Sequence, residues 1–331
     1  MTLLPGKLPV RLLRQLIRYT GAADRAVRIG PRFGEDAAVV DMGDRYLILK
    51  SDPVTFTAKE IGWYAVHVNA NDIAVMGARP RWFQTTLILP PGTTAATART
   101  IIRDVDRAAR ALGIAVTGGH TEVSSAVTRP IIAGDMQGIV AHARLVTSAG
   151  ARPGDALVLT KCAGIEGTSI LARERPAVTR RVLGARGQAL AARFHHRPGI
   201  SVTGEALLAA RAGATAMHDP TEGGVAAGLF ELAWASGCRL DVDLDEIPLH
   251  RFTRELCAHF AIDPLGLIGS GSLLATLPAE RAGRLIDRLA RAGIPARVVG
   301  TVARGRGVRA RRGGRAVPFH WSERDELTRV L

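Results

Sequence analysis

The sequence predicts an α/β protein of two domains, and three observations lead to this prediction. The chain has 331 residues, which is long enough for two domains of ordinary size. In both halves, short apolar runs of strand length alternate with longer segments of helical periodicity. Residues 148–155 are rich in small and turn-forming residues and lie between two predicted strands. We therefore expect one domain at residues 1–150 and a second at residues 151–331.

The first half is expected to contain a mixed sheet with helices. Apolar residues at helical spacing predict helices at residues 8–19, 60–75 and 94–112. Gly77 and Gly113 follow the second and third of these segments, as is usual where a helix ends. Short apolar runs predict strands at residues 37–40, 46–49, 83–89, 114–117 and 130–140. The turn residues between the first two strands predict a hairpin.

The second half shows the same alternation. Apolar runs predict strands at residues 156–160, 214–217, 239–242, 272–277 and 296–301. Helical periodicity predicts helices at residues 164–171, 203–212, 223–235, 249–260 and 280–292. Residues 176–198 are rich in arginine and poorly periodic, so we expect a mobile insertion there.

The bulk composition is typical of a cytoplasmic protein. Hydrophobic residues make up 47% of the chain, which allows a substantial core. No run of about 18 apolar residues is present, so we expect no membrane-spanning helix, and residues 1–10 lack the apolar stretch of a signal peptide. The three cysteines are widely spaced, as is usual in a reducing compartment.

The strongly basic charge raises the question of nucleic-acid binding. The formal net charge is +14, and of the 44 basic residues four are lysines and forty are arginines. The one dense cluster, residues 304–315, contains no aromatic residue on which a base could stack. A solvated arginine-rich surface is therefore favoured, and nucleic acid is an unlikely partner. A basic field would also attract anionic substrates.

Three aspartates stand at the edges of apolar runs, where a carboxylate is usually avoided. Asp36 follows Gly34, Asp52 follows a predicted strand, and Asp72 lies near the end of the helix predicted at residues 60–75. Asn69 is three residues before Asp72 and shares its helix face. Oxygen ligands from separate segments suit a magnesium ion that carries substrate phosphates. Each of these residues also has a simpler interpretation as a helix cap or turn residue.

Residues 118–122, with the sequence Gly-Gly-His-Thr-Glu, directly follow a predicted strand. Paired glycines leave backbone N–H groups that can face an anion. His120 could then bind phosphate, and Glu122 could supply a further metal oxygen. The alternative for His120 is a purely structural role, which is more common for a single histidine at a strand end.

Three glycine-containing turns in the second half could also contact an anion. Residues 218–224 open a predicted helix, whose first N–H groups favour an anion, although a normal capped helix explains them equally well. Residues 161–168 and 268–272 are the other two turns, and neither has a Walker A sequence. Cys162 has no evident histidine or aspartate partner, so we expect a buried thiol.

Taken in order, these motifs resemble the superfamily of aminoimidazole ribonucleotide (AIR) synthetase, also called PurM-like. The superfamily includes thiamine-monophosphate kinase, selenophosphate synthetase and the hydrogenase maturation protein HypE. The similarity covers nearly the whole chain and is closest to the HypE branch. It rests on these segments: Gly34-Glu35-Asp36-Ala37-Ala38, Ser51-Asp52, Asn71-Asp72-Ile73, Gly77-Ala78, Pro80, Pro153-Gly154-Asp155 and Asp219-Pro220-Thr221-Glu222-Gly223-Gly224.

The resemblance implies two α/β domains and a homodimer whose N-terminal domains pair through their sheets. It also implies ATP and Mg²⁺ as cofactors. Asp36, Asp52 and Asp72 would hold the metal, together with Glu122, and Asp72 and His120 would be catalytic. The residues expected to bind the nucleotide are Asn69, Asn71, Gly118, Gly119, Thr121, Asp219, Gly223 and Gly224.

The resemblance leaves the acceptor open. Proteins of the HypE type end in a cysteine and carry an Asn-Glu-Gly turn, whereas this chain ends in Leu331 and has Gly269-Ser270-Gly271. We therefore expect an ATP- and magnesium-dependent enzyme that activates an acceptor oxygen by phosphoryl transfer, the acceptor being a small molecule or a protein tail. The alternative is an ATP-binding maturation or regulatory protein without turnover of a small molecule.

Overall fold

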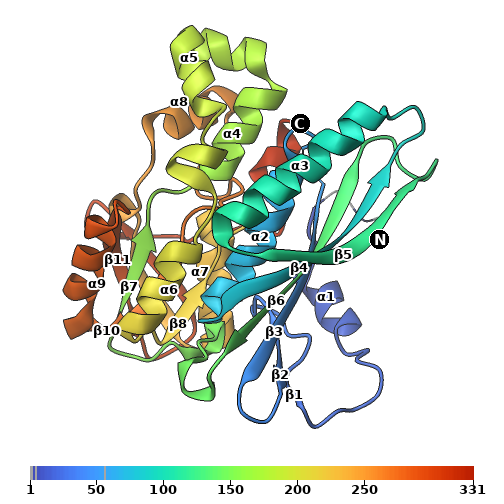
Figure 1. Ribbon diagram of the computed structural model, residues 1–331. Helices are drawn as coiled ribbons and strands as arrows, with labels where there is room; N and C mark the ends of the chain where they lie inside the picture. Colours follow the sequence, from blue (N-terminus) through green and yellow to red (C-terminus); the bar gives the residue numbers. More distant parts are fainter. Residues whose placement is uncertain (1–2, 4–5, 56) are drawn as a thin grey trace. The chain divides into compact units, whose positions relative to one another are not determined.

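The computed structural model describes residue 3 and residues 6–55 and 57–331, and it divides into two compact units. The small unit contains Asp24–Gly30 and Ala37–Leu145. The large unit contains Met1–Ala23, Pro31–Asp36 and Val146–Leu331 (Figure 1). The first helix and Asp36 therefore belong to the large unit, although they precede most of the small unit in the sequence.

The small unit is a six-stranded sheet with two helices. The strand order is β1-β2-β3-β6-β4-β5, and only β4 and β5 pair in parallel. The strands are β1 (Val27–Ile29), β2 (Ala38–Asp41), β3 (Tyr46–Val54), β4 (Arg79–Leu89), β5 (Ala115–Val123) and β6 (Ile131–Val140). The helices are α2 (Ile61–Val75) and α3 (Ala95–Leu112), and both pack against the sheet and each other (Figure 1).

Helix α2 lies at the centre of the small unit. Its own residues are mostly apolar or small, and they are buried on all of its faces. Tyr64 and Ile73 are fully buried in its core. A Cβ at Gly62 would overlap the backbone oxygen of Ile101, so this glycine allows α3 to approach α2 closely. The burial of α2 explains why its polar residues are held in fixed positions.

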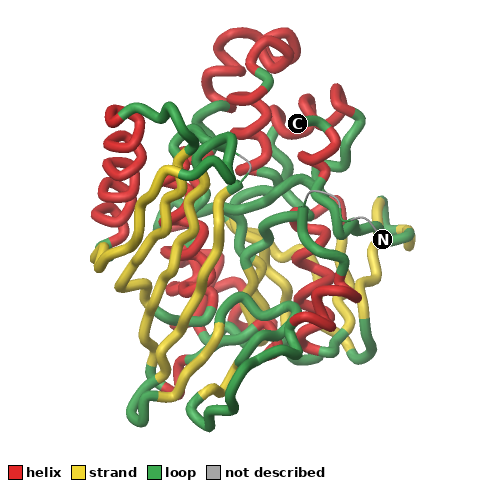
Figure 2. The backbone as a smooth tube through the Cα atoms, turned by 90° about the vertical axis from the view of Figure 1, so that its right-hand side faces the viewer, coloured by secondary structure: helices red, strands yellow, loops and turns green. Residues whose placement is uncertain are grey.

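The large unit is a seven-stranded sheet, of strand order β13-β12-β9-β11-β7-β10-β8, with helices around it. Among the described strands of this sheet, only β12 and β9 pair in parallel. One group of strands that run side by side is clear in Figure 2. The strands are β7 (Asp155–Thr160), β8 (Ala216–His218), β9 (Arg239–Asp243), β10 (Leu274–Pro278), β11 (Ala296–Ala303), β12 (Gly307–Arg312) and β13 (Arg315–Val317). The α-helices are α1 (Val10–Leu16), α4 (Ile165–Glu174), α5 (Pro176–Ala191), α6 (Thr203–Ala212), α7 (Gly224–Ser236), α8 (Arg251–Phe260) and α9 (Ala279–Arg291). Leu229 and Leu232 of α7 pack with Leu157 and Leu240 of the sheet to form the core.

The mixed α/β architecture with two sheets confirms the predicted fold class. The predicted hairpin is also confirmed, since β2 and β3 pair antiparallel. Two strands continue further than predicted: β3 runs through Asp52, and β5 runs through residues 118–122. None of the described helices is both long enough and apolar enough to cross a membrane.

The prediction of a mobile insertion at residues 176–198 is wrong, because α5 occupies most of this segment. Thr179, Leu183, Gly187 and Ala191 are its buried residues, and they recur every four positions. Three of the four are small or polar, so the helical period was not visible in the pattern of large apolar residues. Gly184 has a non-helical backbone conformation and divides the helix into two pieces, which shortened the pattern further.

Candidate functional site

In the small unit, two of the predicted acidic residues surround one lysine. Lys50 and Asp52 are two positions apart on β3 and therefore project from the same face of the strand. Lys50 Nζ lies 3.2 Å from Oδ2 of Asp72, on α2, and 3.7 Å from Oδ2 of Asp52. The Asp72 side chain is 4% exposed and that of Asp52 35%. The cluster thus combines one buried and one solvent-accessible carboxylate around a single positive charge.

Asn69 fixes the geometry of this cluster. Its Nδ2 donates to the backbone oxygen of Asp52 at 3.1 Å and to that of Ala65 at 2.8 Å, which joins β3 to α2. Gly134 lies opposite Asp52 on β6, and a Cβ there would overlap Asn69 Nδ2. Asn71 is also fully buried on α2. The asparagine is therefore built into the structure beside the carboxylates, as its helix face predicted.

The donor set of this cluster fits a magnesium ion. Carboxylate oxygens are the ligands that Mg²⁺ prefers, and Mg²⁺ typically takes only one or two of them from a protein. Asp52 and Asp72 together present two carboxylate groups within 4 Å of Lys50 Nζ, one from β3 and one from α2. A cation bound here would be held by Asp52 and Asp72.

The structure does not bring Glu122 together with these two aspartates within the small unit. Glu122 is on β5, and two strands, β6 and β4, lie between β3 and β5. At about 4.8 Å per strand, the axes of β3 and β5 are about 14 Å apart. Instead, Glu122 Oε2 lies 3.3 Å from Nε2 of His120, and both side chains are exposed. Their roles in metal binding and catalysis stay predictions.

Gly118 and Gly119 lie inside β5 and not in a loop after it. Both have positive φ values, 153° and 148°, and a Cβ at Gly119 would overlap the backbone oxygen of Thr85 on β4. The glycines therefore allow β5 to pair closely with β4. Thr121 follows in the same strand, which pairs with β4 alone and whose nine residues are all exposed.

In the large unit, Asp36 belongs to a buried chain of alternating charges. His218, at the end of β8, places Nδ1 2.8 Å from Oδ1 of Asp36 and Nε2 2.9 Å from Oε2 of Glu231. Lys7 Nζ lies 3.5 Å from Oε1 of the same Glu231. Burial alone would lower the pKa of His218, but Asp36 and Glu231 outweigh this effect and raise it well above 6.5. His218 is therefore a cation at neutral pH.

Glu231 has the opposite shift. Burial alone would raise its pKa, but the positive charges of Lys7 and His218 together have the larger effect and lower the pKa to about 2. The sequence analysis missed Glu231 and Lys7, and treated His218 only as part of a helix-opening turn. A glutamate within the apolar segment of α7 was the one available signal, since such a residue requires a partner.

The second oxygen of Asp36 is also engaged within the large unit. Oδ2 accepts a hydrogen bond from Ser148 Oγ at 3.0 Å. The neighbouring Glu35 accepts from the backbone N–H groups of Ser148 and Ala149, at 3.1 and 3.2 Å. Gly34 has a φ of 85°, and a Cβ there would lie 3.0 Å from the backbone oxygen of Glu231. This segment is thus fixed to the large unit, and metal binding by Asp36 stays a prediction.

The N-terminus of α7 contacts a carboxylate of the chain itself. The N–H of Gly223 donates to Oδ2 of Asp325 at 2.6 Å. Gly224 has a φ of 61°, and a Cβ there would overlap the backbone oxygen of Leu265. Asp219 is buried just before this turn. The sequence predicted that the first N–H groups of this helix favour an anion; the N–H of Gly223 donates to Asp325 and that of Gly224 to the backbone oxygen of Thr221, at 3.0 Å.

A protonated glutamate lies near this turn. Burial raises the pKa of Glu166 to about 8; a hydrogen bond with Ser270 lowers it, and the charges of Glu222 and Asp325 raise it again. Burial likewise raises the pKa of Asp325 to about 6, although its backbone hydrogen bonds oppose this. Glu166 is thus a neutral carboxylic acid at pH 7.

The strand–glycine–helix turn at residues 161–168 serves the packing of the large unit. Lys161 Nζ lies 2.9 Å from Oε1 of Glu205 and donates to the backbone oxygen of Ser201 at 2.6 Å. Burial raises the pKa of Cys162 to about 11, so its thiol is protonated at neutral pH. The sequence predicted a buried thiol, and Cys162 is partly buried.

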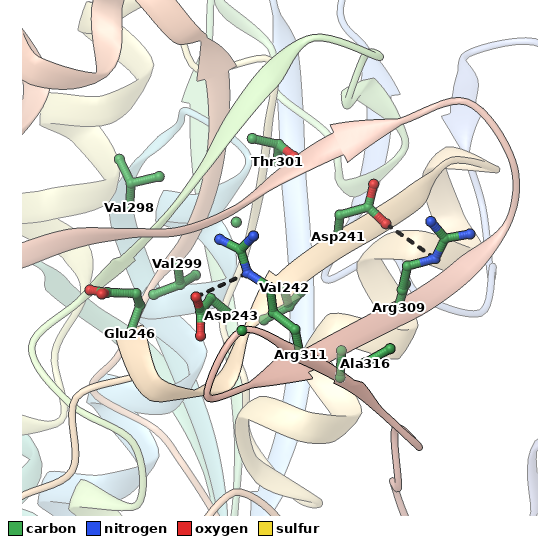
Figure 3. Close-up of a pocket in the computed structure, with 13 residues that line it drawn as sticks. Asp241, Val242, Asp243, Glu246, Val298, Val299, Thr301, Arg309, Arg311 and Ala316 are labelled. Carbon is green, nitrogen blue, oxygen red and sulfur yellow. Dashed lines mark hydrogen bonds and ion pairs between the residues drawn. The ribbon is translucent and has the colours of Figure 1, made fainter.

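The arginine cluster at residues 304–315 forms β12, β13 and the turns that flank them. On the outer face of β9, Asp241 and Asp243 lie 3.9 and 3.0 Å from Nε of Arg309 and Arg311 (Figure 3). These pairs line a groove of about 520 Å³. Two of the cluster's arginines are therefore compensated across the strands, which supports the interpretation as an ordinary charged surface.

Comparison with known proteins defines the class of the chain. The model of the AIR synthase related protein N-terminal domain matches residues 34–140, and that of the C-terminal domain matches residues 152–313. Carbamoyl dehydratase HypE of Rhodobacter capsulatus is 33% identical over 254 residues, which cover 75% of this chain and 70% of that protein. The chain therefore belongs to the AIR synthase related family.

Solved structures show the same fold. Hydrogenase maturation protein HypE in complex with ATP aligns with a TM-score of 0.73 at 24% identity, covering 95% of this chain and 91% of that one. Thiamine-monophosphate kinase from Stenotrophomonas maltophilia K279a aligns with a TM-score of 0.70 at 25% identity, covering 92% and 96%. The PurM-like fold predicted from the motifs is confirmed.

Proposed function

We propose that this protein is an ATP- and magnesium-dependent enzyme that activates an acceptor oxygen by phosphoryl transfer. The observation that carries the proposal is the cluster of Asp52, Asp72 and Lys50, fixed by Asn69 at the join of β3 and α2. The proteins similar to this chain support the reaction class, since one is named a carbamoyl dehydratase and another a kinase. Both names fit phosphoryl transfer to an acceptor oxygen, which in a dehydration turns that oxygen into a leaving group.

In this proposal the small unit supplies the charged part of the site. Asp72 and Asp52 would hold Mg²⁺, with Asp36 and Glu122 as further candidate ligands, and the metal would neutralise phosphate charge. Lys50 would add a positive charge to the same cluster, next to the two carboxylates. The contribution of these residues is positioning and electrostatic stabilisation, which dominate catalysis of phosphoryl transfer.

The predicted nucleotide-binding residues complete the proposed site. The asparagines of α2 hold the carboxylates in place, and the glycine-containing segments provide backbone near the phosphates. These residues are Asn69, Asn71, Gly118, Gly119, His120, Thr121, Asp219, Gly223 and Gly224. The three cysteines are all free, in agreement with the proposed cytoplasmic location.

We also infer a homodimer formed through the small unit. β5 is the outermost strand of its sheet, and its Val116 and Val123 are 47% and 63% exposed. An exposed edge strand with apolar side chains is a ready surface for pairing with a second chain.

The test is ATP-dependent release of ADP with a panel of candidate acceptors. Asp72→Asn removes the charge of the buried carboxylate while keeping its shape, and should abolish turnover without loss of folding. Asp106→Asn is the matched control, because Asp106 is an exposed aspartate of the same unit whose one ion pair among the described residues is with Arg110. Undiminished turnover in Asp72→Asn would contradict the proposal that Asp72 binds the metal. Magnesium-dependent ATP binding without turnover on any acceptor would favour the alternative of a maturation or regulatory protein.

A further inference from the structure

Four arginines that take part in none of the clusters described above line one depression on the surface of the large unit. Helices α6 and α9 pack side by side there (Figure 1). The depression has a volume of about 250 Å³ and is lined by Arg211 and Ala212 of α6 and by three arginines of α9. These three are Arg281, Arg284 and Arg288. Their spacing of three and four residues places them on one face of α9.

The guanidinium groups of this arginine quartet are not held by ion pairs within the described part of the chain. None of its four guanidinium groups forms an ion pair with a described residue, whereas Arg309 and Arg311 are paired with aspartates. Glu280 and Asp287, the two acidic residues of α9, form no ion pair with the quartet either. Four like charges around one concavity repel one another unless an anion binds between them.

The local structure explains how the fold accommodates these charges. Arg211 lies in the last turn of α6, where the helix dipole favours a cation. Arg281 lies against Gly213, the residue that ends α6, and a Cβ at Gly213 would overlap its Nη1. The absent side chain at Gly213 therefore leaves space for the Arg281 guanidinium at the negative end of α6. The four arginines therefore come together from two different helices, α6 and α9.

We propose that the arginine quartet binds a small anion that carries two or more phosphate groups. Guanidinium groups present paired N–H donors that match phosphate oxygens, and α6 and α9 supply them from two walls. Four guanidinium groups can bind more phosphate oxygens at once than a single phosphate group presents, so the quartet fits an anion with at least two phosphate groups. None of the four arginines belongs to the residues proposed above to bind ATP and Mg²⁺.

The shape and surroundings favour a small anion over a nucleic acid. By helical geometry Glu280 and Asp287 are next to the arginine stripe on α9, and their carboxylates would repel the phosphates of a long backbone. No exposed aromatic residue is among the residues lining the depression, so nothing there would stack a base.

Calorimetric titration with inorganic pyrophosphate, without magnesium, tests the proposal. The titration is done in the Asp72→Asn background, so that the proposed phosphate site of the small unit does not contribute. We expect saturable binding that weakens with salt, and a loss of at least about tenfold in affinity for each of Arg281→Ala and Arg288→Ala. Arg254→Ala is the control, since Arg254 is an exposed, unpaired arginine of α8 in the same unit, and it should leave the affinity unchanged.

Three outcomes would overturn the proposal. The first is absence of pyrophosphate binding to the folded protein. The second is equal affinity in the quartet variants and in Arg254→Ala, with all melting temperatures unchanged. The third is tighter binding of a single-stranded oligonucleotide than of pyrophosphate, lost in the same quartet variants, which would assign the surface to nucleic acid.

Discussion

Glu166→Gln should make the stability of the large unit less dependent on pH. Glu166 is buried on α4, beside Ser270, and faces the negative charges of Glu222 and Asp325. Glutamine has nearly the same shape and stays neutral at every pH. The substitution therefore removes a titration and little else.

The magnitude follows from the raised pKa. In the unfolded chain Glu166 ionises near pH 4.5, and in the folded chain near pH 8. Between these values the folded protein keeps a proton that the unfolded chain has released, so this group makes folding less favourable as pH rises. The penalty is absent below pH 4.5, reaches ~3 kcal/mol at pH 7 and levels off at ~5 kcal/mol above pH 8. Glu166→Gln should thus match the wild type near pH 4.5 and exceed its stability by ~3 kcal/mol at pH 7.

Urea denaturation between pH 5 and 8.5 measures this difference. Two of the four tryptophans, Trp234 and Trp321, are in the large unit, so replacing Trp63 and Trp82 by phenylalanine makes fluorescence report on that unit alone. Glu174→Gln is a control on the same helix, because Glu174 is exposed to solvent, whereas Glu166 is buried. A stability difference between Glu166→Gln and wild type that is constant across this pH range would refute the reasoning.

Two further substitutions test other parts of the structure. His218→Ala leaves Asp36 and Glu231 buried without the cation between them, so the free energy of unfolding should fall by about 3–5 kcal/mol at pH 6 in chemical denaturation. Because the pKa of His218 is raised in the folded state, its ion pairs stabilise the fold fully below pH 6.5, and this contribution is lost as pH rises through the folded pKa. A loss of stability in His218→Ala that grows with pH would contradict the assignment. Val123→Lys on β5 should convert the dimer into a monomer, as measured by light scattering. Val298→Lys is the control, since Val298 is 38% exposed on β11 of the large unit, and it should leave the dimer intact. An unchanged dimer in both variants would exclude β5 as the interface.

The helices and most strands were predictable because their boundaries are set locally. Thr94 accepts from the N–H of Thr97 and begins α3, and Gly113 ends it with a φ of 67°, as the sequence indicated. β5 was predicted to stop at Gly118, but its pairing with β4 uses the backbone and therefore continues through the glycines. Helix α5 was missed because its buried positions hold residues such as Gly187, which carry little apolar signal.

The candidate site was predictable only where its residues share one element. Asn69 and Asp72 lie on one helix, so their common face followed from the spacing. Lys50 could have been found as well, since it is two positions before Asp52 on the same strand. The contact of His218 with Asp36 and Glu231 joins three separate segments, and no sequence spacing encodes it.

The central claim is that Asp72 helps to hold a magnesium ion that carries ATP. Calorimetry of ATP binding with and without Mg²⁺, for the wild type and for Asp72→Asn, tests it most directly. The account predicts binding by the wild type that requires Mg²⁺, and a loss of that binding in Asp72→Asn while Asp106→Asn binds normally. Equally tight binding without Mg²⁺, or an unchanged affinity in Asp72→Asn, would contradict it.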